Sequence, residues 1–166
     1  MFPSYEESLT DSLNAFQKHV FEAVQNMVDV QTVDNVNTEA SHVEVVHSGN
    51  KTELCIFLSA KTSDAFINLY VSIEEIILFL SGWHEHFLST EKSINETIAA
   101  ASGLIEKYLK GDIKIVEIRS NDKPYKWLLY EWNINNWIWK STSSVLCIFS
   151  FFGKKAKSDL VFAIRR

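Results

Sequence analysis

Residues 125–139, YKWLLYEWNINNWIW, hold four of the five tryptophans of this 166-residue chain. Large apolar side chains recur at every second position on both sides of Asn135-Asn136, a pattern typical of two β-strands joined by a tight turn. With an even number of turn residues, one set of side chains shares a sheet face and Trp127 lies on the other face. The set consists of Leu128, Tyr130, Trp132, Trp137 and Trp139. Such a face is either part of the hydrophobic core or a surface that binds a partner.

Strands are also predicted on both sides of this hairpin. Short polar breaks separate them, which permits hairpins and therefore an antiparallel sheet. With two-residue turns, Ile113 and Ile115 share the face of Trp132, and Val116 shares the face of Trp127. Both faces are then apolar, so helices cover one, and the other needs the N-terminal strands, a partner subunit or a ligand. The predicted strands are Ile113–Arg119, Tyr125–Asn133, Trp137–Ser141, Val145–Phe152 and Leu160–Ile164.

An amphipathic helix and three strands are predicted in the first part of the chain. Ser4 followed by Glu7 matches a capping box, in which each side chain binds a free backbone N–H at a helix start. Apolar residues then recur every three or four positions from Leu9 to Met27, which indicates a helix with one core-facing side. After a polar loop, segments rich in Val, Ile and Phe predict the strands His42–His47, Thr52–Leu58 and Ala65–Val71.

Two more helices are predicted before the tryptophan-rich strands. Ser72 and Glu75 form a second capping-box pattern, so a helix is expected to continue to about Phe87. The next helix is predicted at Thr90–Lys110 and ends at Gly111, because glycine adopts the left-handed conformation without steric cost. The order is then helix, three strands, two helices and about five strands. This segregation is typical of an α+β fold with one or more antiparallel sheets, in which the helices pack on one face of a curled sheet.

Length and composition favour one globular domain, residues 1–166. Hydrophobic residues make up 46% of the chain, and its two prolines and five glycines leave no room for a flexible linker. No apolar run is long enough to cross a bilayer, and the N-terminus lacks the basic start of a secretory signal. We therefore expect a soluble cytoplasmic protein in which Cys55 and Cys147 are reduced, buried thiols.

Charge is distributed unevenly along the chain. The formal net charge is −5, but residues 1–111 hold 16 acidic and 6 basic side chains, whereas residues 112–166 hold 5 and 10. We expect acidic helices and a basic edge on the later strands. The basic segment Lys154–Lys157 and the nearby Arg165-Arg166 suggest nucleic-acid binding, but the acidic balance of the whole chain argues against it. A lysine-rich turn that protects a sheet edge explains this segment better.

No local motif predicts an active site, a cofactor site or a metal site. On the second predicted helix, His84 and His86 would point about 200° apart and could not bind one ion. In an extended turn they could, but no dense cluster of ligand residues accompanies them. Glu74 and Glu75 fit the first turn of that helix, where negative charge is favourable. A glycine-rich phosphate loop is also missing from the sequence. We therefore expect a non-enzymatic protein without a cofactor, while a site assembled from distant residues would leave no local trace.

A protein that binds another protein is the function that these observations favour. Acidic side chains would attract a basic partner, and exposed aromatic side chains would anchor it. An immunity-type inhibitor that neutralises a basic toxin fits this description. The alternatives are a secretion-type chaperone that holds a client segment, and a pocket protein or enzyme with an aromatic-lined sheet cavity. A homodimer would also cover the second face of the sheet. The candidate partner-binding residues are Trp127, Trp132, Trp137, Trp139, Tyr130, Glu74 and Glu75.

Overall fold

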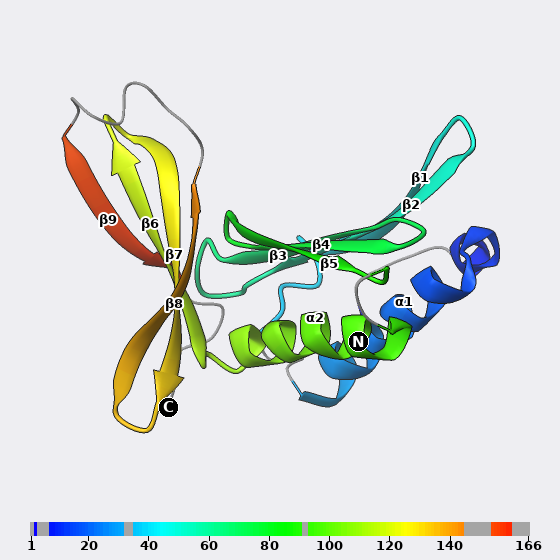
Figure 1. The fold of residues 1–166 in the computed structure, drawn as a ribbon, viewed down its shortest axis with the longest axis horizontal. Helices are drawn as coiled ribbons and strands as arrows, with labels where there is room; N and C mark the ends of the chain where they lie inside the picture. The colour runs from blue at the N-terminus through cyan, green and yellow to red at the C-terminus, as the bar shows by residue number, and fades with distance from the viewer. Residues whose placement is uncertain (1, 3–6, 32–34, 91–92, 145–153, 161–166) are drawn as a thin grey trace.

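Two antiparallel sheets and two α-helices make up the described part of the chain (Figure 1). The computed structural model describes residues 2, 7–31, 35–90, 93–144 and 154–160. The predicted α+β class is confirmed. The strands form two antiparallel sheets, the predicted curl is not pronounced, and the order of helices and strands differs from the predicted order.

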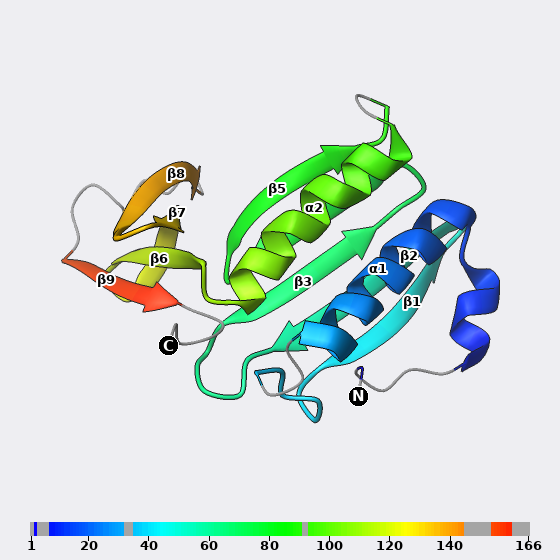
Figure 2. The ribbon, with the colours of Figure 1, turned by 90° about the horizontal axis from the view of Figure 1, so that it is seen from below.

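Five strands connected by short turns form the first sheet, and both helices lie on one of its faces (Figure 2). The 3₁₀-helix η1 (Glu7–Ser12) and helix α1 (Ala15–Gln31) precede the strands, and helix α2 (Ile94–Leu109) follows them. The sheet is an antiparallel meander, because each strand pairs with the next one along the chain. Its strands are β1 (His42–Ser48), β2 (Lys51–Ser59), β3 (Phe66–Val71), β4 (Glu75–Leu80) and β5 (Trp83–Leu88).

The hydrophobic core lies between this sheet and the two helices. Alternate residues of β3 and β4 point toward the helices and are fully buried, which gives both strands a two-residue period of burial. Val24 of α1 and Ile105 of α2 are buried to the same degree. Burial of each such side chain contributes about 1.5 to 3 kcal/mol of hydrophobic stabilisation. The strands contribute Leu54, Ile56, Leu58, Ile67, Leu69, Val71, Ile76, Leu78 and Leu80.

The helix predicted from residue 72 to residue 87 is wrong, because these residues form the hairpin of β4 and β5. Ile76, Leu78 and Leu80 are buried, and the residues between them are half-buried. A run that is apolar at consecutive positions lacks the three- to four-residue period of an amphipathic helix. Ser81 and Gly82 have φ angles of 48° and 97°, as a tight hairpin turn requires. The first sheet therefore has five strands, where three were expected.

Local hydrogen bonds decide where the helices begin. The Asn14 side chain accepts the backbone N–H of Gln17 at 2.9 Å, and the Gln17 side chain accepts that of Asn14 at 3.1 Å. This reciprocal pair starts α1 in the manner of a capping box, whereas the predicted cap Ser4 lies outside the described residues. A Ser-x-x-Glu capping box starts α2. Gly111, with φ of 76°, follows the end of α2 as predicted.

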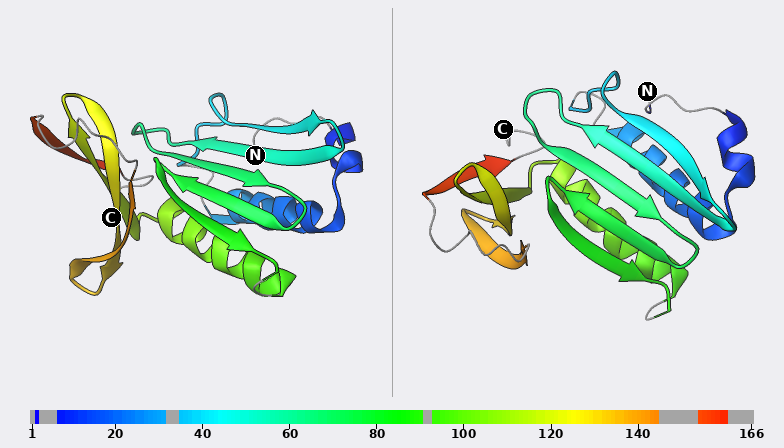
Figure 3. Two further views of the ribbon diagram at one scale, coloured as in Figure 1. Left: turned by 45° about the horizontal axis from the view of Figure 1, so that its top comes forward. Right: turned by 90° about the horizontal axis from the view of Figure 1, so that it is seen from above.

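The second sheet stands across one end of the first (Figure 3). Its strands are β6 (Ile113–Ser120), β7 (Lys123–Asn133), β8 (Asn136–Ser144) and β9 (Lys155–Leu160), in the spatial order β8-β7-β6-β9. β9 is an edge strand in the basic segment that the sequence predicts to be a turn. Its lysines are exposed, which hinders pairing with further strands. The strand predicted at Val145–Phe152 lies outside the described residues, as does most of the one at Leu160–Ile164.

The pairing of β7 with β8 confirms the faces predicted for the tryptophan-rich hairpin. Tyr130 pairs with Trp139, and Trp132 pairs with Trp137. Because side chains alternate along a strand, these four share one face and Trp127 lies on the other. A β-bulge next to Tyr130 leaves this part of the register unchanged, because it lies on the far side of the Tyr130–Trp139 pair from the turn.

Strand β6 carries its side chains on the faces opposite to those predicted. Ile113 and Ile115 share the face of Trp127, not that of the other tryptophans. A two-residue turn alone would give the predicted faces. The structure has a β-bulge between Ile118 and Arg119, which shifts the pairing by one residue. A shift of one residue moves every following side chain to the other face.

Candidate functional site

The open face of the first sheet, opposite the helices, carries a continuous row of aromatic rings. All five strands contribute to this row, and Figure 3 shows the face from above with the helices behind it. Centroids of neighbouring rings lie 4.5 to 5.8 Å apart, within the range of stacked and edge-to-face contacts. We call this row the aromatic stripe; it consists of His42, Phe57, Tyr70, Phe79, His84 and His86.

Strand register places these rings in a line. His42 of β1 lies opposite Phe57 of β2, and Phe79 of β4 lies opposite His84 of β5. Tyr70 of β3 fills the space between them, with ring centroids 5.8 Å from Phe57 and 5.7 Å from Phe79. The rings at the centre are half-buried, whereas His42 is exposed. Each of the six rings therefore keeps part of its surface exposed.

Carboxylates lie beside the stripe. Glu44 and Glu53 occupy the same face of the sheet as Tyr70. Burial raises the pKa of Tyr70, and Cys55, Glu53 and Glu44 raise it further. Burial also raises the pKa of the Cys55 thiol to about 11, with Glu53 and Glu44 as additional causes. Glu44 and Glu53 therefore place negative charge on the open face beside Tyr70, and Cys55 is a protonated thiol at neutral pH, which is unsuited to act as a nucleophile.

Two histidines at the end of the stripe are held by hydrogen bonds. His86 Nδ1 lies 2.7 Å from Glu75 Oε1, and His84 Nδ1 lies 2.8 Å from Ser143 Oγ on the second sheet. Because both histidines lie on β5, they share a sheet face, and the helical separation predicted for them is wrong. Among the described residues, no group of three or more His, Cys, Asp or Glu side chains could hold a metal ion.

Glu74 and Glu75 lie at the turn between β3 and β4, so their predicted role at a helix start is wrong. The Ser72 N–H donates to the Glu75 carbonyl at 2.9 Å, and the Ser89 N–H donates to the Glu74 carbonyl at 2.8 Å. These bonds hold the turn in one conformation. The Glu75 carboxylate contacts His86, a member of the stripe. Glu74 lines a groove of about 510 Å³ at the end of the sheet that holds the β3–β4 turn. We call it the end groove; its walls include Val46, Lys51, Glu53, Ile73 and Glu74.

The aromatic residues singled out in the sequence form a separate cluster on the outer face of the second sheet. The rings of Trp132 and Trp137 are in edge-to-face contact, with centroids 5.2 Å apart. Lys114 Nζ lies 5.0 Å from the Trp137 centroid and 5.6 Å from that of Tyr130, in cation–π geometry. Trp139 is 56% exposed. The structure thus brings these four predicted residues together, but far from Glu74 and Glu75.

Trp127 has a structural position between the two sheets. Its Nε1 donates to Glu117 Oε2 at 3.0 Å, and Glu117 also accepts a bond from Arg119. The indole lies against Gly82 in the β4–β5 turn, so close that a Cβ atom at Gly82 would stand 2.5 Å from Trp127 Nε1. Trp127 therefore contacts both sheets while it stays half-buried, and its role in partner binding remains a prediction.

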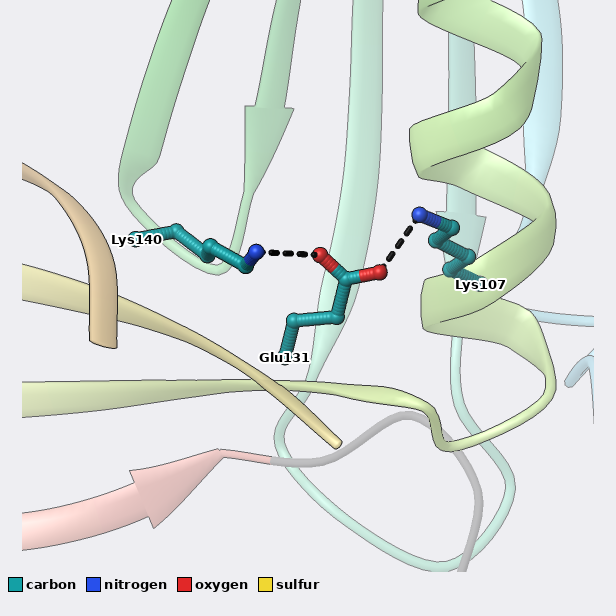
Figure 4. Close-up of polar contacts among 3 residues, drawn as sticks. All are labelled: Lys107, Glu131 and Lys140. Carbon is teal, nitrogen blue, oxygen red and sulfur yellow. Dashed lines mark hydrogen bonds and ion pairs between the residues drawn. The ribbon is translucent and has the colours of Figure 1, made fainter. Parts of the chain in front are cut away.

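Glu131 connects the second sheet to helix α2 (Figure 4). Its carboxylate accepts a hydrogen bond from Lys107 of α2 and lies 3.5 Å from Lys140 Nζ of β8. The hydrogen bond from Lys107 is the main cause that lowers the pKa of Glu131, and the charges of Lys107 and Lys140 add to it, against a smaller effect of burial. The folded state therefore favours the ionised carboxylate.

Replacing Glu131 with glutamine is expected to lower the free energy of unfolding by about 0.5 to 1 kcal/mol at neutral pH, because both lysines are about half exposed and solvent screens them. A lowered pKa stabilises the fold above the ordinary pKa of glutamate, and this contribution disappears as the pH falls. Urea denaturation at pH 7 and at about pH 3 should therefore show a smaller difference between the two proteins at the lower pH. An equal difference at both values would contradict the ion-pair explanation.

The sequence did not predict the aromatic stripe, because it assigns residues 72 to 87 to a helix. Because the predicted fold lacks β4 and β5, it does not place Phe79, His84 and His86 beside Phe57 and Tyr70. A signal was present: from Ile76 to Leu80 every residue is apolar, and Ser81-Gly82 follows. Such a short apolar run before a turn is consistent with a strand that carries apolar side chains on both faces.

Comparison with known proteins finds no counterpart. The chain matches no protein-family profile, no curated protein sequence and no solved structure. Among the described residues, neither α1 nor α2 is long and apolar enough to cross a membrane.

Proposed function

We propose that this chain is a non-enzymatic protein-binding protein and that the aromatic stripe on the open face of the first sheet contacts a basic partner protein. The observation that carries this proposal is the row of ring contacts that crosses all five strands, with Glu44, Glu53 and Glu75 on the same face of the sheet. An array of this kind contributes little to the core, because the helices lie on the opposite face of the sheet.

Half-buried aromatic side chains are well suited to anchor a partner. They are already ordered by their neighbours, so binding costs little conformational entropy. Aromatic residues also dominate the binding energy of protein interfaces, where a single anchor is often worth about 2 kcal/mol or more. Phe57, Tyr70 and Phe79 present such anchors on a rigid sheet instead of a loop.

The charge of the open face selects the kind of partner. Glu44, Glu53 and Glu75 lie on this face, and the pKa values of Tyr70 and Cys55 are raised in part by the first two. A negative surface accelerates the association of a positive partner and opposes nucleic acid. An immunity-type inhibitor of a basic toxin in the cytoplasm combines these properties, and it needs no catalytic residue.

A secretion-type chaperone is the second candidate that the same face supports. Five strands spaced about 4.8 Å apart make the stripe roughly 20 Å long, enough for an extended client segment of about six residues. The two functions differ in the state of the partner, which is folded in the first case and unfolded in the second. Binding that persists after the partner is denatured would favour the chaperone.

The experiment compares two aromatic surfaces of the same chain. Proteins that co-purify with the tagged chain in its source cells are identified, purified and titrated by calorimetry. Replacing both Phe57 and Phe79 with alanine is expected to weaken binding at least about tenfold. Trp139→Ala is the matched control, because Trp139 is an exposed aromatic residue on the other sheet.

Circular dichroism of all variants must show unchanged folding for this comparison to count. Normal binding by the double variant, together with a loss caused by Trp139→Ala, would move the interface to the second sheet. A partner with an acidic surface would contradict the proposed charge complementarity.

A further inference from the structure

We infer that the end groove binds a long basic side chain of the partner, and that arginine fits it best. This inference rests on the proposed function, because the groove lies on the same face of the sheet as the aromatic stripe. It names a subsite and the chemistry of the residue that occupies it.

The walls of the groove come from two ordered elements. Val46 and Glu53 lie opposite each other on β1 and β2, with both side chains on the open face. Ile73 and Glu74 come from the β3–β4 turn, which two backbone hydrogen bonds hold in place. The groove of about 510 Å³ lies within the usual range of ligand sites, about 300 to 1,000 Å³.

Two large apolar side chains in the lining of the groove are exposed to solvent. Val46 is 43% exposed and Ile73 is 60% exposed, and both belong to the small set of large apolar side chains that are exposed among the described residues. Exposed apolar side chains that gather in one groove indicate a binding site more than those that occur singly. An apolar stem laid between Val46 and Ile73 would remove this surface from water.

Carboxylates in the lining favour a bound side chain that ends in a positive charge. Glu53 and Glu74 outnumber the basic Lys51 in the lining, so a cation is preferred over an anion. Arginine and lysine both combine an apolar stem with a positive head. The guanidinium group is the better match, because it donates several hydrogen bonds in a planar fork and is less strongly hydrated than an ammonium group.

The test uses a small probe that needs no partner. N-acetyl-arginine-N-methylamide is titrated into the ¹⁵N-labelled chain, and N-acetyl-citrulline-N-methylamide serves as the neutral analogue of the same shape. Saturable shifts of the amides of Val46, Glu53, Ile73 and Glu74 are expected with the arginine probe, and markedly weaker binding with the citrulline probe.

A charge-matched pair of variants completes the test. Replacing Glu53 and Glu74 with glutamine is expected to raise the dissociation constant of the arginine probe about tenfold, because two charged acceptors are lost. Replacing Glu22 and Glu39, which are exposed elsewhere, removes the same charge and is expected to leave the constant unchanged. Equal effects of both pairs would show nonspecific attraction and overturn the inference.

Shifts scattered over the surface, equal binding of citrulline, or no shift up to the solubility limit of the probe would also overturn it. The proposed function is judged separately by the stripe variants. Weakened partner binding by Phe57→Ala with Phe79→Ala, combined with a failed arginine titration, would retain the partner interface and remove only the subsite. Saturable binding of the arginine probe, combined with normal partner binding by the Phe57 and Phe79 variant, would support the groove as a binding site and contradict the role of the stripe.

Discussion

Replacing Gly82 with alanine is expected to lower the free energy of unfolding by about 2 to 4 kcal/mol. Two physical effects add up at this position. The φ angle of 97° disfavours any residue with a Cβ atom. The added Cβ would also stand 2.5 Å from Nε1 and 2.7 Å from Cε2 of Trp127, so the indole must move and the contact between the sheets must loosen.

Two other glycines separate these effects. Gly49 has φ of 59° and no atom within 4 Å of an added Cβ, so alanine there is expected to cost only the backbone strain, about 1 kcal/mol. Gly103 lies inside α2 with open space around it, and alanine there is expected to stabilise the protein by about 0.5 to 1 kcal/mol.

Chemical denaturation followed by tryptophan fluorescence measures all three variants. From the most to the least stable, the expected order is Gly103→Ala, wild type, Gly49→Ala and Gly82→Ala. The emission of the folded Gly82→Ala protein should also change, because Trp127 leaves its contact. Equal losses for Gly49→Ala and Gly82→Ala would show that Trp127 does not pack against the turn.

Replacing Gln17 with glutamate is expected to lower the free energy of unfolding by about 3 to 5 kcal/mol at neutral pH. Gln17 is fully buried, and its Nε2 donates to the carbonyl oxygens of Thr52 at 2.8 Å and of Val71 at 2.9 Å. These bonds attach α1 to β2 and β3. A carboxylate would place a buried negative charge against two carbonyl oxygens and leave both without this donor.

The expected loss depends on pH in a definite direction. Burial and the facing carbonyl oxygens raise the pKa of the introduced carboxyl above its unfolded value. The folded state then holds a proton that the unfolded state releases, so stability falls as the pH rises above about 4. Denaturation at pH 7 and at about pH 4 should therefore show a smaller difference from wild type at the lower value.

Two further variants separate charge from packing at this site. Gln17→Met removes the donors without adding charge, and is expected to cost about 2 kcal/mol at every pH. Asn14→Ala removes the helix cap alone, at a cost of about 1 kcal/mol. A Gln17→Glu protein as stable as Gln17→Met at pH 7 would contradict the buried-charge explanation.

Features that depend on near neighbours in the sequence were predicted well. The apolar stripe is confirmed from Phe16 to Val24, whereas its predicted first part lies in η1 and before α1. The end of α2 at Gly111 and the shared face of Trp132, Trp137 and Trp139 are confirmed. Each of them follows from side-chain periodicity or from the conformational freedom of one residue. The face of β6 could not be predicted in this way, because a bulge at Ile118 and Arg119 reverses it and leaves no mark in the residue pattern.

The positions of the candidate site residues depend on contacts between residues that are distant in the sequence. Trp127 has the same residue type as Trp139, yet it lies between the sheets because Gly82, 45 positions earlier in the chain, leaves room for its ring. The sequence predicts Glu74 and Glu75 at a helix start, whereas the structure places Glu74 in the β3–β4 turn beside the end groove and Glu75 at the start of β4. The aromatic stripe consists of residues from five separate strands.

The sequence by itself determined the α+β class, the antiparallel strands and the two faces of the tryptophan-rich hairpin. These properties come from short-range periodicity, which any stretch of ten to fifteen residues already contains. Only the tertiary structure decided that residues 75 to 88 are strands, that two sheets form, and that six rings line up on the open face. The reason is physical: a strand that is apolar on both faces gains its pairing energy and its side-chain neighbours from other strands, so its own residues do not specify its position.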